Sequence, residues 1–298
     1  MQDGVAIKAM SNYVQVAAGD RVYLCTLRGR FRKKKHGIIT GDHVRIQVTG
    51  ADTGVVEEIL PRRNELVRPS IANVDQALVV LAVARPALNR NLLDRMLVIL
   101  EEKQMDAVIC LNKFDLMADM DIQEQKDMDE LIRVYRKIGY PVIPVSIHDP
   151  ASVAQLLETC HKKISVLAGP SGVGKSSILN AIRPALGLAT GTVSNKSGQG
   201  RHTTRHVELL RVGDDGFLAD SPGFSILEFP TVEPRDLGFF FPEMVPLIPG
   251  CRFNSCVHYR EPDCAVKAAV GKDKEVDPDR YENYVAFLEE ILNQERRY

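Results

Sequence analysis

The chain has no run of about 18 or more apolar residues and no apolar segment at its N-terminal end. A membrane-spanning helix needs about 20 consecutive apolar residues and a secretory signal needs an apolar core, so we expect neither membrane insertion nor secretion. Internal repeats and low-complexity tracts are also lacking. The net charge is only −1, so the chain as a whole gives no indication of a polyanionic partner. We expect a cytoplasmic monomer with no membrane contact.

Positive charge is concentrated in residues 1–70, which hold twelve Lys and Arg residues against seven Asp and Glu residues. Over the same stretch, short apolar runs separated by Gly and Asp turns predict β-strands. These strands are expected at residues 5–9, 13–17, 22–27, 43–48 and 55–60. Five short strands are typical of an OB-type β-barrel, a fold that often binds nucleic acids.

The loop between the third and fourth of these strands is strongly basic. Its candidate RNA contacts are Arg28, Arg30, Arg32, Lys33, Lys34 and Lys35. The alternative is a solvated loop that only keeps the barrel soluble.

From about residue 74 the pattern changes to strands that alternate with helices. Apolar runs predict strands at residues 76–84, 107–111, 142–145, 163–168, 207–212 and 217–219. Apolar residues at helical spacing predict helices within residues 93–100, 128–138, 153–160 and 176–182. This alternation predicts a doubly wound, mostly parallel α/β sheet, whose ligands bind beyond the carboxyl ends of the strands.

A phosphate-binding loop follows the strand at residues 163–168. Residues 169–176 fit the pattern G-x-x-x-x-G-K-[ST], in which backbone N–H groups cradle nucleotide phosphates. Lys175 is expected to neutralise phosphate charge and Ser176 to present its hydroxyl to Mg²⁺. The candidate GTP contacts here are Gly169, Pro170, Ser171, Gly172, Val173, Gly174, Lys175, Ser176 and Ser177.

Asn112, Lys113 and Asp115 form an N-K-x-D string, with which guanine-specific P-loop proteins read their base. The Asp115 carboxylate can accept from guanine N1–H and the 2-amino group, whereas adenine would leave it unpaired. An ATP-dependent kinase or ATPase is therefore disfavoured. Ser146, after the next strand, is a further candidate contact to the base.

The base-reading string precedes the phosphate-binding loop along the chain, whereas the phosphate-binding loop comes first in an ordinary GTPase. This reversed order predicts a circularly permuted GTPase domain, whose two ends are free to carry other modules.

Residues 220–223 match the D-x-x-G string that follows a sheet strand. Asp220 is expected to hold Mg²⁺ through water, and the Gly223 N–H to contact the γ-phosphate. Phe224 stands where Ras-like enzymes use a Gln to orient the attacking water, which Phe cannot do.

A Gly-, Ser- and Asn-rich segment precedes Asp220, and a mobile switch loop is expected there. Thr203 or Thr204 is expected to reach Mg²⁺, so the candidate magnesium ligands are Ser176, Thr204 and Asp220. His202 is the candidate for orienting the attacking water. A partner-facing or structural role is its alternative.

Three cysteines and one histidine cluster toward the C-terminal end, at Cys251, Cys256, His258 and Cys264. Such a donor set forms a closed structural zinc site with no open position for chemistry. We expect one zinc ion per chain, with free thiols beside a surface histidine as the alternative. A last helix is expected to start at Asp277-Pro278.

Together these strings resemble the ribosome small subunit-dependent GTPase A family of bacterial circularly permuted GTPases, over nearly the whole chain. The resemblance also includes Arg-Gly-Arg-Phe-Arg at residues 28–32 and Asn73-Val-Asp75. It implies an OB-fold RNA-binding domain at residues 1–68, a circularly permuted GTPase domain at 69–230 and a zinc-binding domain with a C-terminal helix at 231–298.

The resemblance further implies a function. It implies a factor that binds the small ribosomal subunit and its 16S RNA late in assembly, and that hydrolyses GTP to GDP and phosphate with stimulation by the subunit. The rival interpretation is an RNA-binding assembly module in which GTP is only a structural ligand.

Overall fold

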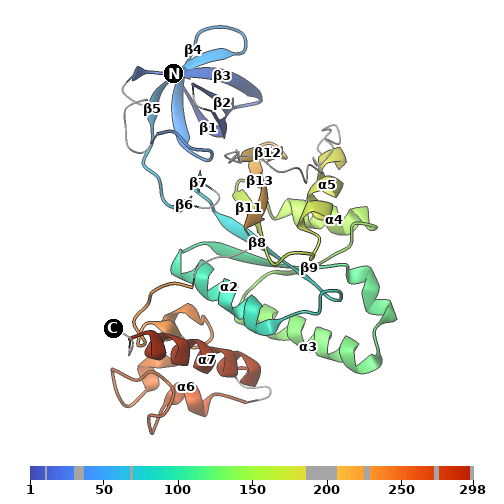
Figure 1. Ribbon diagram of the computed structural model, residues 1–298, viewed down its shortest axis with the longest axis vertical. Helices are drawn as coiled ribbons and strands as arrows, with labels where there is room; N and C mark the ends of the chain where they lie inside the picture. The colour runs from blue at the N-terminus through green and yellow to red at the C-terminus, as the bar shows by residue number, and fades with distance from the viewer. Residues whose placement is uncertain are drawn as a thin grey trace, which may run out of the picture.

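The computed structural model describes residues 1–10, 12–29, 37–67, 70–185, 207–224, 229–271 and 275–295. Figure 1 shows three units from top to bottom: a β-barrel, an α/β unit and a C-terminal helical unit. No helix in these ranges combines the length and the apolarity needed to cross a membrane. The predicted domain boundaries at residues 68 and 230 stay predictions.

The first unit is a closed barrel of five strands, β1 (Gln2–Ala9), β2 (Tyr13–Ala18), β3 (Arg21–Leu27), β4 (His43–Val48) and β5 (Thr53–Ile59). The strands pair in the order β1-β2-β3-β5-β4, and β4 pairs back onto β1. Alternate residues of β3, namely Tyr23, Cys25 and Leu27, are buried in the barrel core, as the period of two along a strand requires. The predicted OB-type barrel is confirmed.

A short hairpin of β6 (Glu65–Val67) and β7 (Ser70–Ala72) follows the barrel. The sequence does not predict it, because strands of three residues are too short to show a period. The Ala72 N–H donates to the Thr40 carbonyl at 2.9 Å, so the hairpin packs against the turn before β4. Position 41 in that turn requires glycine, since a Cβ there would lie 2.1 Å from the Ala72 carbonyl oxygen.

The α/β unit contains the strands β8 (Gln76–Ala82), β9 (Asp106–Asn112), β10 (Val142–Val145), β11 (Ile164–Ala168), β12 (Glu208–Val212) and β13 (Gly216–Phe224). They lie in the order β10-β9-β8-β11-β13-β12. Four of the neighbouring pairs are parallel, and β12–β13 is antiparallel. The predicted mostly parallel sheet is confirmed.

Helices cover both faces of this sheet (Figure 1). α2 (Arg90–Glu102) and α3 (Ile122–Ile138) lie on one face, and α4 (Pro150–Glu158) and α5 (Lys175–Ala185) lie on the other. All seven residues of the central strand β8 are buried, because both of its faces are covered. Apart from Gln76, whose amide donates to the Ser165 hydroxyl and the Thr159 carbonyl, the strand is apolar, which is the pattern that predicts it from the sequence.

Local signals delimit α3. The Asp121 side chain and the Glu124 side chain exchange hydrogen bonds with each other's backbone N–H groups in a capping box. The helix ends at Gly139, whose φ of 115° lies in the region that favours glycine. A 3-10 turn, η1 (Phe114–Asp119), connects β9 to this helix.

The barrel and the α/β sheet are joined edge to edge. β1 pairs antiparallel with β12 through Lys8 and Glu208, so that the barrel strands continue the sheet. The Lys8 ammonium lies 2.6 Å from the Glu208 carboxylate, and the Thr40 hydroxyl donates to the Val207 carbonyl at 3.0 Å. Nothing in the pattern of either strand predicts this pairing.

β13 is longer than the sequence predicts. The strand was expected to end at residue 219, with Asp220 and Gly223 beyond it, but the structure continues it to Phe224. After an irregularity beside Val166, Phe224 pairs with Ala168 of β11. The D-x-x-G string therefore lies in the irregular part of β13, between the residue pairs Ala219–Val166 and Phe224–Ala168, and its first residue, Asp220, pairs with Glu208 of β12.

The C-terminal unit consists of η2 (Leu237–Phe240), η3 (Ile248–Gly250), α6 (Ala265–Ala268) and α7 (Pro278–Glu295). Its core contains Phe241, Met244, Tyr284 and Phe287, with Val98 of α2 in the same apolar cluster. The predicted last helix is confirmed, and it packs against α2 of the α/β unit.

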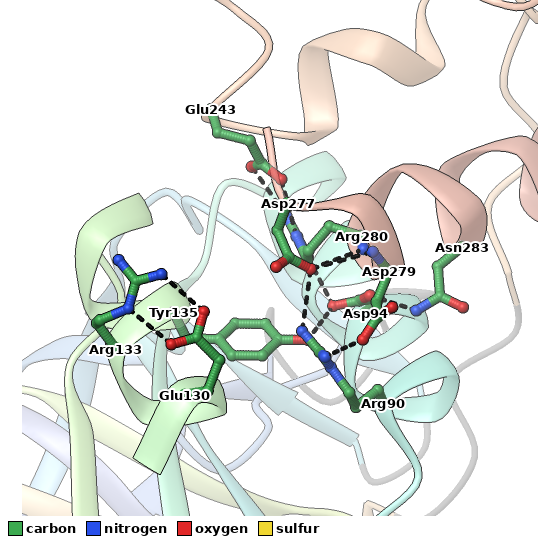
Figure 2. A network of polar contacts seen from close by, with 10 residues as sticks. All are labelled: Arg90, Asp94, Glu130, Arg133, Tyr135, Glu243, Asp277, Asp279, Arg280 and Asn283. Atoms are coloured by element: carbon green, nitrogen blue, oxygen red, sulfur yellow. Dashed lines mark hydrogen bonds and ion pairs between the residues drawn. The ribbon is translucent and has the colours of Figure 1, made fainter. Parts of the chain in front are cut away.

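A buried polar network fixes α7 on the α/β unit (Figure 2). The Arg280 guanidinium of α7 has no exposed surface and donates to Asp94 of α2 at 2.7 Å and to Glu243 at 2.8 and 2.9 Å. The Tyr135 hydroxyl of α3 and the Asn283 amide also donate to Asp94, at 2.5 and 2.6 Å. Every charge in this contact is paired, so the two units meet through a satisfied network rather than through apolar side chains alone.

Candidate functional site

Residues 169–174 form the turn between β11 and α5. Gly169, Gly172 and Gly174 have φ values of 139°, 83° and 97°, which lie outside the range that other residues adopt easily. At two of these positions a side chain would also collide. A Cβ at position 169 would lie 2.2 Å from the Val80 carbonyl oxygen, and one at position 174 would lie 2.3 Å from the Asn112 Nδ2.

Asn112 joins the base-reading string to the phosphate-binding loop. Its Nδ2 donates to the Val173 carbonyl at 2.7 Å, and the side chain is almost fully buried. Its Oδ1 is also buried and has no hydrogen-bond partner among the described residues. A buried polar atom without a partner costs about 1–3 kcal/mol, so this position fits a ligand that brings a donor.

Lys113 makes a second bridge between the same segments. Its backbone has a φ of 57°, and its Nζ donates to the Gly172 carbonyl at 3.1 Å and to the Arg85 carbonyl. The extended side chain therefore lies over the phosphate-binding loop, on the side where the carboxyl ends of the strands meet.

The Asp115 carboxylate is held by Ser146. The Ser146 hydroxyl donates to Asp115 Oδ1 at 2.6 Å, and its oxygen accepts from the His148 N–H at 3.2 Å. Asp115 itself is exposed, so its second oxygen is accessible to a ligand. Residues 31 positions apart are thus placed together by the pairing of β9 with β10.

The Lys175 ammonium is wrapped by its own loop. It donates to the carbonyls of Gly169 and Pro170 at 2.6 and 2.7 Å. Burial lowers the pKa of this ammonium group from its ordinary value, because the charged form loses hydration. An anion bound in the loop would restore the lost stabilisation. Ser176 and Ser177, at the start of α5, are exposed.

Asp220 contacts a residue that lies in none of the sequence motifs. Its carboxylate pairs with the guanidinium of Arg183, near the end of α5. The Arg183 Nε is buried without a hydrogen-bond partner among the described residues. No pattern points to Arg183, because it lies outside every motif and 37 residues from Asp220.

The switch segment lies outside the described residues. His202, Thr203 and Thr204 fall between residues 186 and 206, so their predicted roles stay predictions. The same holds for Arg30, Arg32, Lys33, Lys34 and Lys35 of the basic loop. Arg28 is described: its guanidinium pairs with Glu57 of β5 at 2.5 Å and remains half-exposed.

The four predicted zinc ligands converge in the C-terminal unit, with their donor atoms within 4.8 Å of one another. The Sγ atoms of Cys251 and Cys264 lie 3.8 Å apart, and each lies 3.5 Å from the His258 Nδ1. Metal–ligand lengths of about 2.3 Å for sulfur and 2.0–2.1 Å for nitrogen, at tetrahedral angles, require about 3.8 Å and about 3.5–3.6 Å between these donors. The cluster therefore fits a tetrahedral zinc ion.

The environment of these donors also suits a cation. Burial raises the pKa of the Cys256 thiol to about 12, so that a thiolate is stable there only beside a positive charge. Burial lowers the pKa of His258, which favours the neutral imidazole that binds metals. Neighbouring side chains hold the ligand loop: the Tyr281 hydroxyl donates to the His258 carbonyl at 2.8 Å, and the Tyr284 hydroxyl to the Val257 carbonyl at 2.7 Å.

The fold and the site together define a class of protein. A phosphate-binding loop after the central strand β11, a base-reading loop after β9 and the reversed order of the two are the features of a circularly permuted P-loop GTPase. A β-barrel precedes this unit and a Cys₃His cluster follows it.

Comparison with known proteins specifies the family. The sequence model of the RsgA GTPase family matches residues 59–230, and that of the RsgA N-terminal domain matches residues 3–56. The small ribosomal subunit biogenesis GTPase RsgA of Geobacillus sp. (strain WCH70) is 46% identical over 298 residues, covering 100% of both chains. That of Bacillus subtilis (strain 168) is 43% identical over 302 residues, again covering 100% of both. The chain belongs to the RsgA GTPase family and is a GTP-hydrolysing enzyme.

Two solved structures have the same fold along nearly the whole chain. YloQ, described as a circularly permuted GTPase, superimposes with a TM-score of 0.83 at 39% identity, covering 99% of this chain and 96% of its own. YjeQ from Thermotoga maritima superimposes with a TM-score of 0.81 at 35% identity, covering 98% of each chain. The permuted arrangement is therefore shared with known structures.

Proposed function

We propose that this protein binds the small ribosomal subunit and its 16S RNA in the cytoplasm, as a monomer, and acts late in subunit assembly. GTP hydrolysis, stimulated by the subunit, would release it. The relatives that match the chain from end to end are named as GTPases of small-subunit biogenesis, which supports this proposal. The nucleotide-binding part of this proposal rests on the hydrogen bond from Asn112 to the phosphate-binding loop. That bond couples base recognition to phosphate binding within one site.

Guanine would be read by Asp115. Its carboxylate would accept from N1–H and the 2-amino group, while Ser146 fixes its orientation from the other side. Asn112 and Lys113 would contact the same base from above the phosphate-binding loop. Adenine lacks that pair of donors and would leave the carboxylate unpaired, at a cost of a few kcal/mol.

The phosphates would lie in the loop of residues 169–177, contacted by its backbone N–H groups and by Lys175. The Lys175 ammonium now donates to two carbonyls of its own loop, which phosphate oxygens would replace. The Gly223 N–H would contact the γ-phosphate.

Hydroxyl and carboxylate oxygens are the ligands that Mg²⁺ prefers, and Ser176, Thr204 and Asp220 supply them. Magnesium would neutralise the charge that develops on the phosphates. Asp220 is paired with Arg183 in this structure through one carboxylate oxygen, Oδ2, so its other oxygen would accept from a water bound to the metal. His202, Thr203 and Thr204 are proposed to complete the catalytic site.

One zinc ion per chain would be held by Cys251, Cys256, His258 and Cys264, whose distances and burial fit it. The ion would stabilise the fold of the C-terminal unit, because four protein ligands leave no open position.

The barrel would bind RNA through the basic loop of Arg28, Arg30, Arg32, Lys33, Lys34 and Lys35. The exposed side chains of Tyr13 on β2 and Leu24 on β3 support this proposal, because aromatic and apolar groups on a barrel face can stack against unpaired bases. The partial pairing of Arg28 with Glu57 would direct its guanidinium along the barrel surface.

The decisive measurement is GTP hydrolysis with increasing amounts of purified small subunits. We expect the rate to rise well above the intrinsic one for the wild type, and to rise less for His202→Ala. The absence of stimulation at any subunit concentration would exclude the proposal. If His202→Ala or Thr204→Ala abolished hydrolysis but left release from the subunit unchanged, GTP would be a structural ligand only.

A further inference from the structure

A cavity of about 850 Å³ lies beside the base-reading loop. Its walls come from parts of the stretch 83–90, which follows β8, and from residues of η1, α3 and the start of α7. Both the α/β unit and the C-terminal unit therefore contribute to it. Pockets that bind ligands in proteins usually measure about 300–1,000 Å³, so this cavity is large enough to take one.

The floor of this cavity is apolar. Leu88, Leu116 and Met120 are half-buried there, and the buried side chains of Met128 and Leu131 lie beneath them. A half-buried apolar floor is stabilised when a partner's apolar side chains cover it and remove it from water.

The rim is acidic. Six carboxylate residues line the cavity against two arginines: Asp119, Glu124, Asp127, Glu130, Asp277 and Asp279 against Arg85 and Arg90. Arg90 already pairs with Asp277 and Asp279, as Figure 2 shows, so its charge offsets one of the two carboxylates on the α7 side and none on the other side. On the opposite side, formed by η1 and α3, Glu130 pairs with Arg133, and the excess of negative charge comes from Asp119, Glu124 and Asp127. Such a rim repels RNA phosphates and attracts cationic groups.

We propose that this cavity, which we call the acidic groove, binds a cationic amphipathic segment of a partner protein. Leucine-like side chains of that segment would cover Leu88 and Leu116, and its Lys or Arg side chains would pair with Asp119 and Asp127. This is the helix-in-groove mode, in which the apolar face of a helix fills an apolar floor and charges at the rim set its orientation.

The acidic groove is connected to the nucleotide site by direct contacts. The Arg85 carbonyl at its edge accepts from Lys113, whose Nζ also donates to the Gly172 carbonyl of the phosphate-binding loop. On the floor, the Leu116 N–H donates to the Lys113 carbonyl at 3.0 Å. A segment bound against residues 85–88 and Leu116 holds Lys113 in place, and GDP leaves more slowly.

The test uses the full-length protein and a fluorescent peptide of about 14 residues, built from Leu and Lys at helical spacing. Fluorescence anisotropy should show binding to the wild type, which weakens as salt rises from about 0.05 to 0.5 M. Asp119→Lys with Asp127→Lys should weaken binding at least tenfold, and so should Ala87→Trp, which fills the groove from an exposed position. Asp129→Lys is the matched control, because Asp129 is exposed on α3, as Asp127 is, but lies outside the groove. This substitution should change peptide binding less than twofold.

A second readout follows release of a fluorescent GDP. A saturating amount of the peptide should slow release from the wild type at least threefold, and should leave release from the Ala87→Trp variant unchanged. Equal peptide binding by the wild type and the double lysine variant would overturn the proposal. So would equal binding of a peptide with Glu in place of Lys, or displacement of the peptide by single-stranded RNA. A dimer that forms with rising protein concentration and is lost in Ala87→Trp would identify a second copy of this chain as the occupant instead.

Discussion

Removal of the Arg280 guanidinium should destabilise the contact between the α/β and C-terminal units more than any surface substitution. Its side chain has no exposed surface, and the carboxylates of Asp94 and Glu243 beside it are 0% and 4% exposed. Arg280→Met keeps most of the side-chain volume but leaves two buried carboxylates without their cation. The loss of one partner of a buried ion pair costs about 3–5 kcal/mol. Contacts of the guanidinium with the Tyr135 and Phe241 rings, 5.5 and 4.8 Å from the ring centroids, are lost as well.

Urea denaturation of the zinc-loaded protein at pH 7 measures this cost. The urea concentration at the unfolding midpoint should fall, while the dependence of the unfolding free energy on urea concentration stays the same. Glu290→Gln is the matched control, because it removes the ion pair between Arg95 of α2 and Glu290 of α7, the same two helices. These two side chains are 28% and 37% exposed, and an exposed ion pair contributes at most about 1 kcal/mol to stability. The triple variant with Arg280→Met, Asp94→Asn and Glu243→Gln should recover part of the loss, since no charge then remains buried. A cost for Arg280→Met no larger than that for Glu290→Gln would refute this account of the contact.

Three further outcomes are expected. Asp115→Asn should weaken GDP binding about 10- to 150-fold by calorimetry, the equivalent of a charged hydrogen bond of about 1.5–3 kcal/mol; unchanged affinity would mean that guanine is read elsewhere. Gly174→Ala should abolish nucleotide binding, because the new Cβ would lie 2.3 Å from the Asn112 Nδ2. Gly139→Ala is the control: it has a similar φ, but no atom lies within 4 Å of the new Cβ. This control variant should be less stable and should keep its nucleotide affinity. Cys264→Ala should reduce bound zinc, measured by atomic absorption, from about one ion per chain to well below half. It should also lower the midpoint of thermal unfolding, and a variant with full zinc content would exclude this ligand set.

Much of the fold follows from the sequence because its signals are local. The apolar run of β8 and the helical spacing along α2 depend on residues within one element, and burial on both faces of a sheet preserves them. The phosphate-binding loop and the N-K-x-D string are also local, since their chemistry requires fixed spacing along the chain. The reversed order of these two strings predicts the permutation without any tertiary information.

The predictions from the sequence are wrong or incomplete where a segment's structure depends on contacts with residues far away in the chain, or where a strand is too short to show a pattern. β13 continues past its predicted end because its backbone pairs with Ala168 of another strand, which no periodicity within β13 encodes. The hairpin of β6 and β7 is too short to carry a pattern. The pair of Arg183 with Asp220 joins a helix end to a strand, and neither residue's neighbours in the chain indicate it.

The sequence by itself determined the order of the motifs in this protein, and from them it predicts which residues hold guanine, phosphate and zinc. Only the tertiary structure decided how the units meet. Arg280 and Asp94 are 186 residues apart, and β1 joins β12 at the opposite end of the α/β unit. The acidic groove gains one of its walls from the start of α7, which docks on α2. The physical reason is that motifs depend on spacing along one stretch of chain, whereas docking depends on burial and charge matched between distant stretches, which no local pattern records.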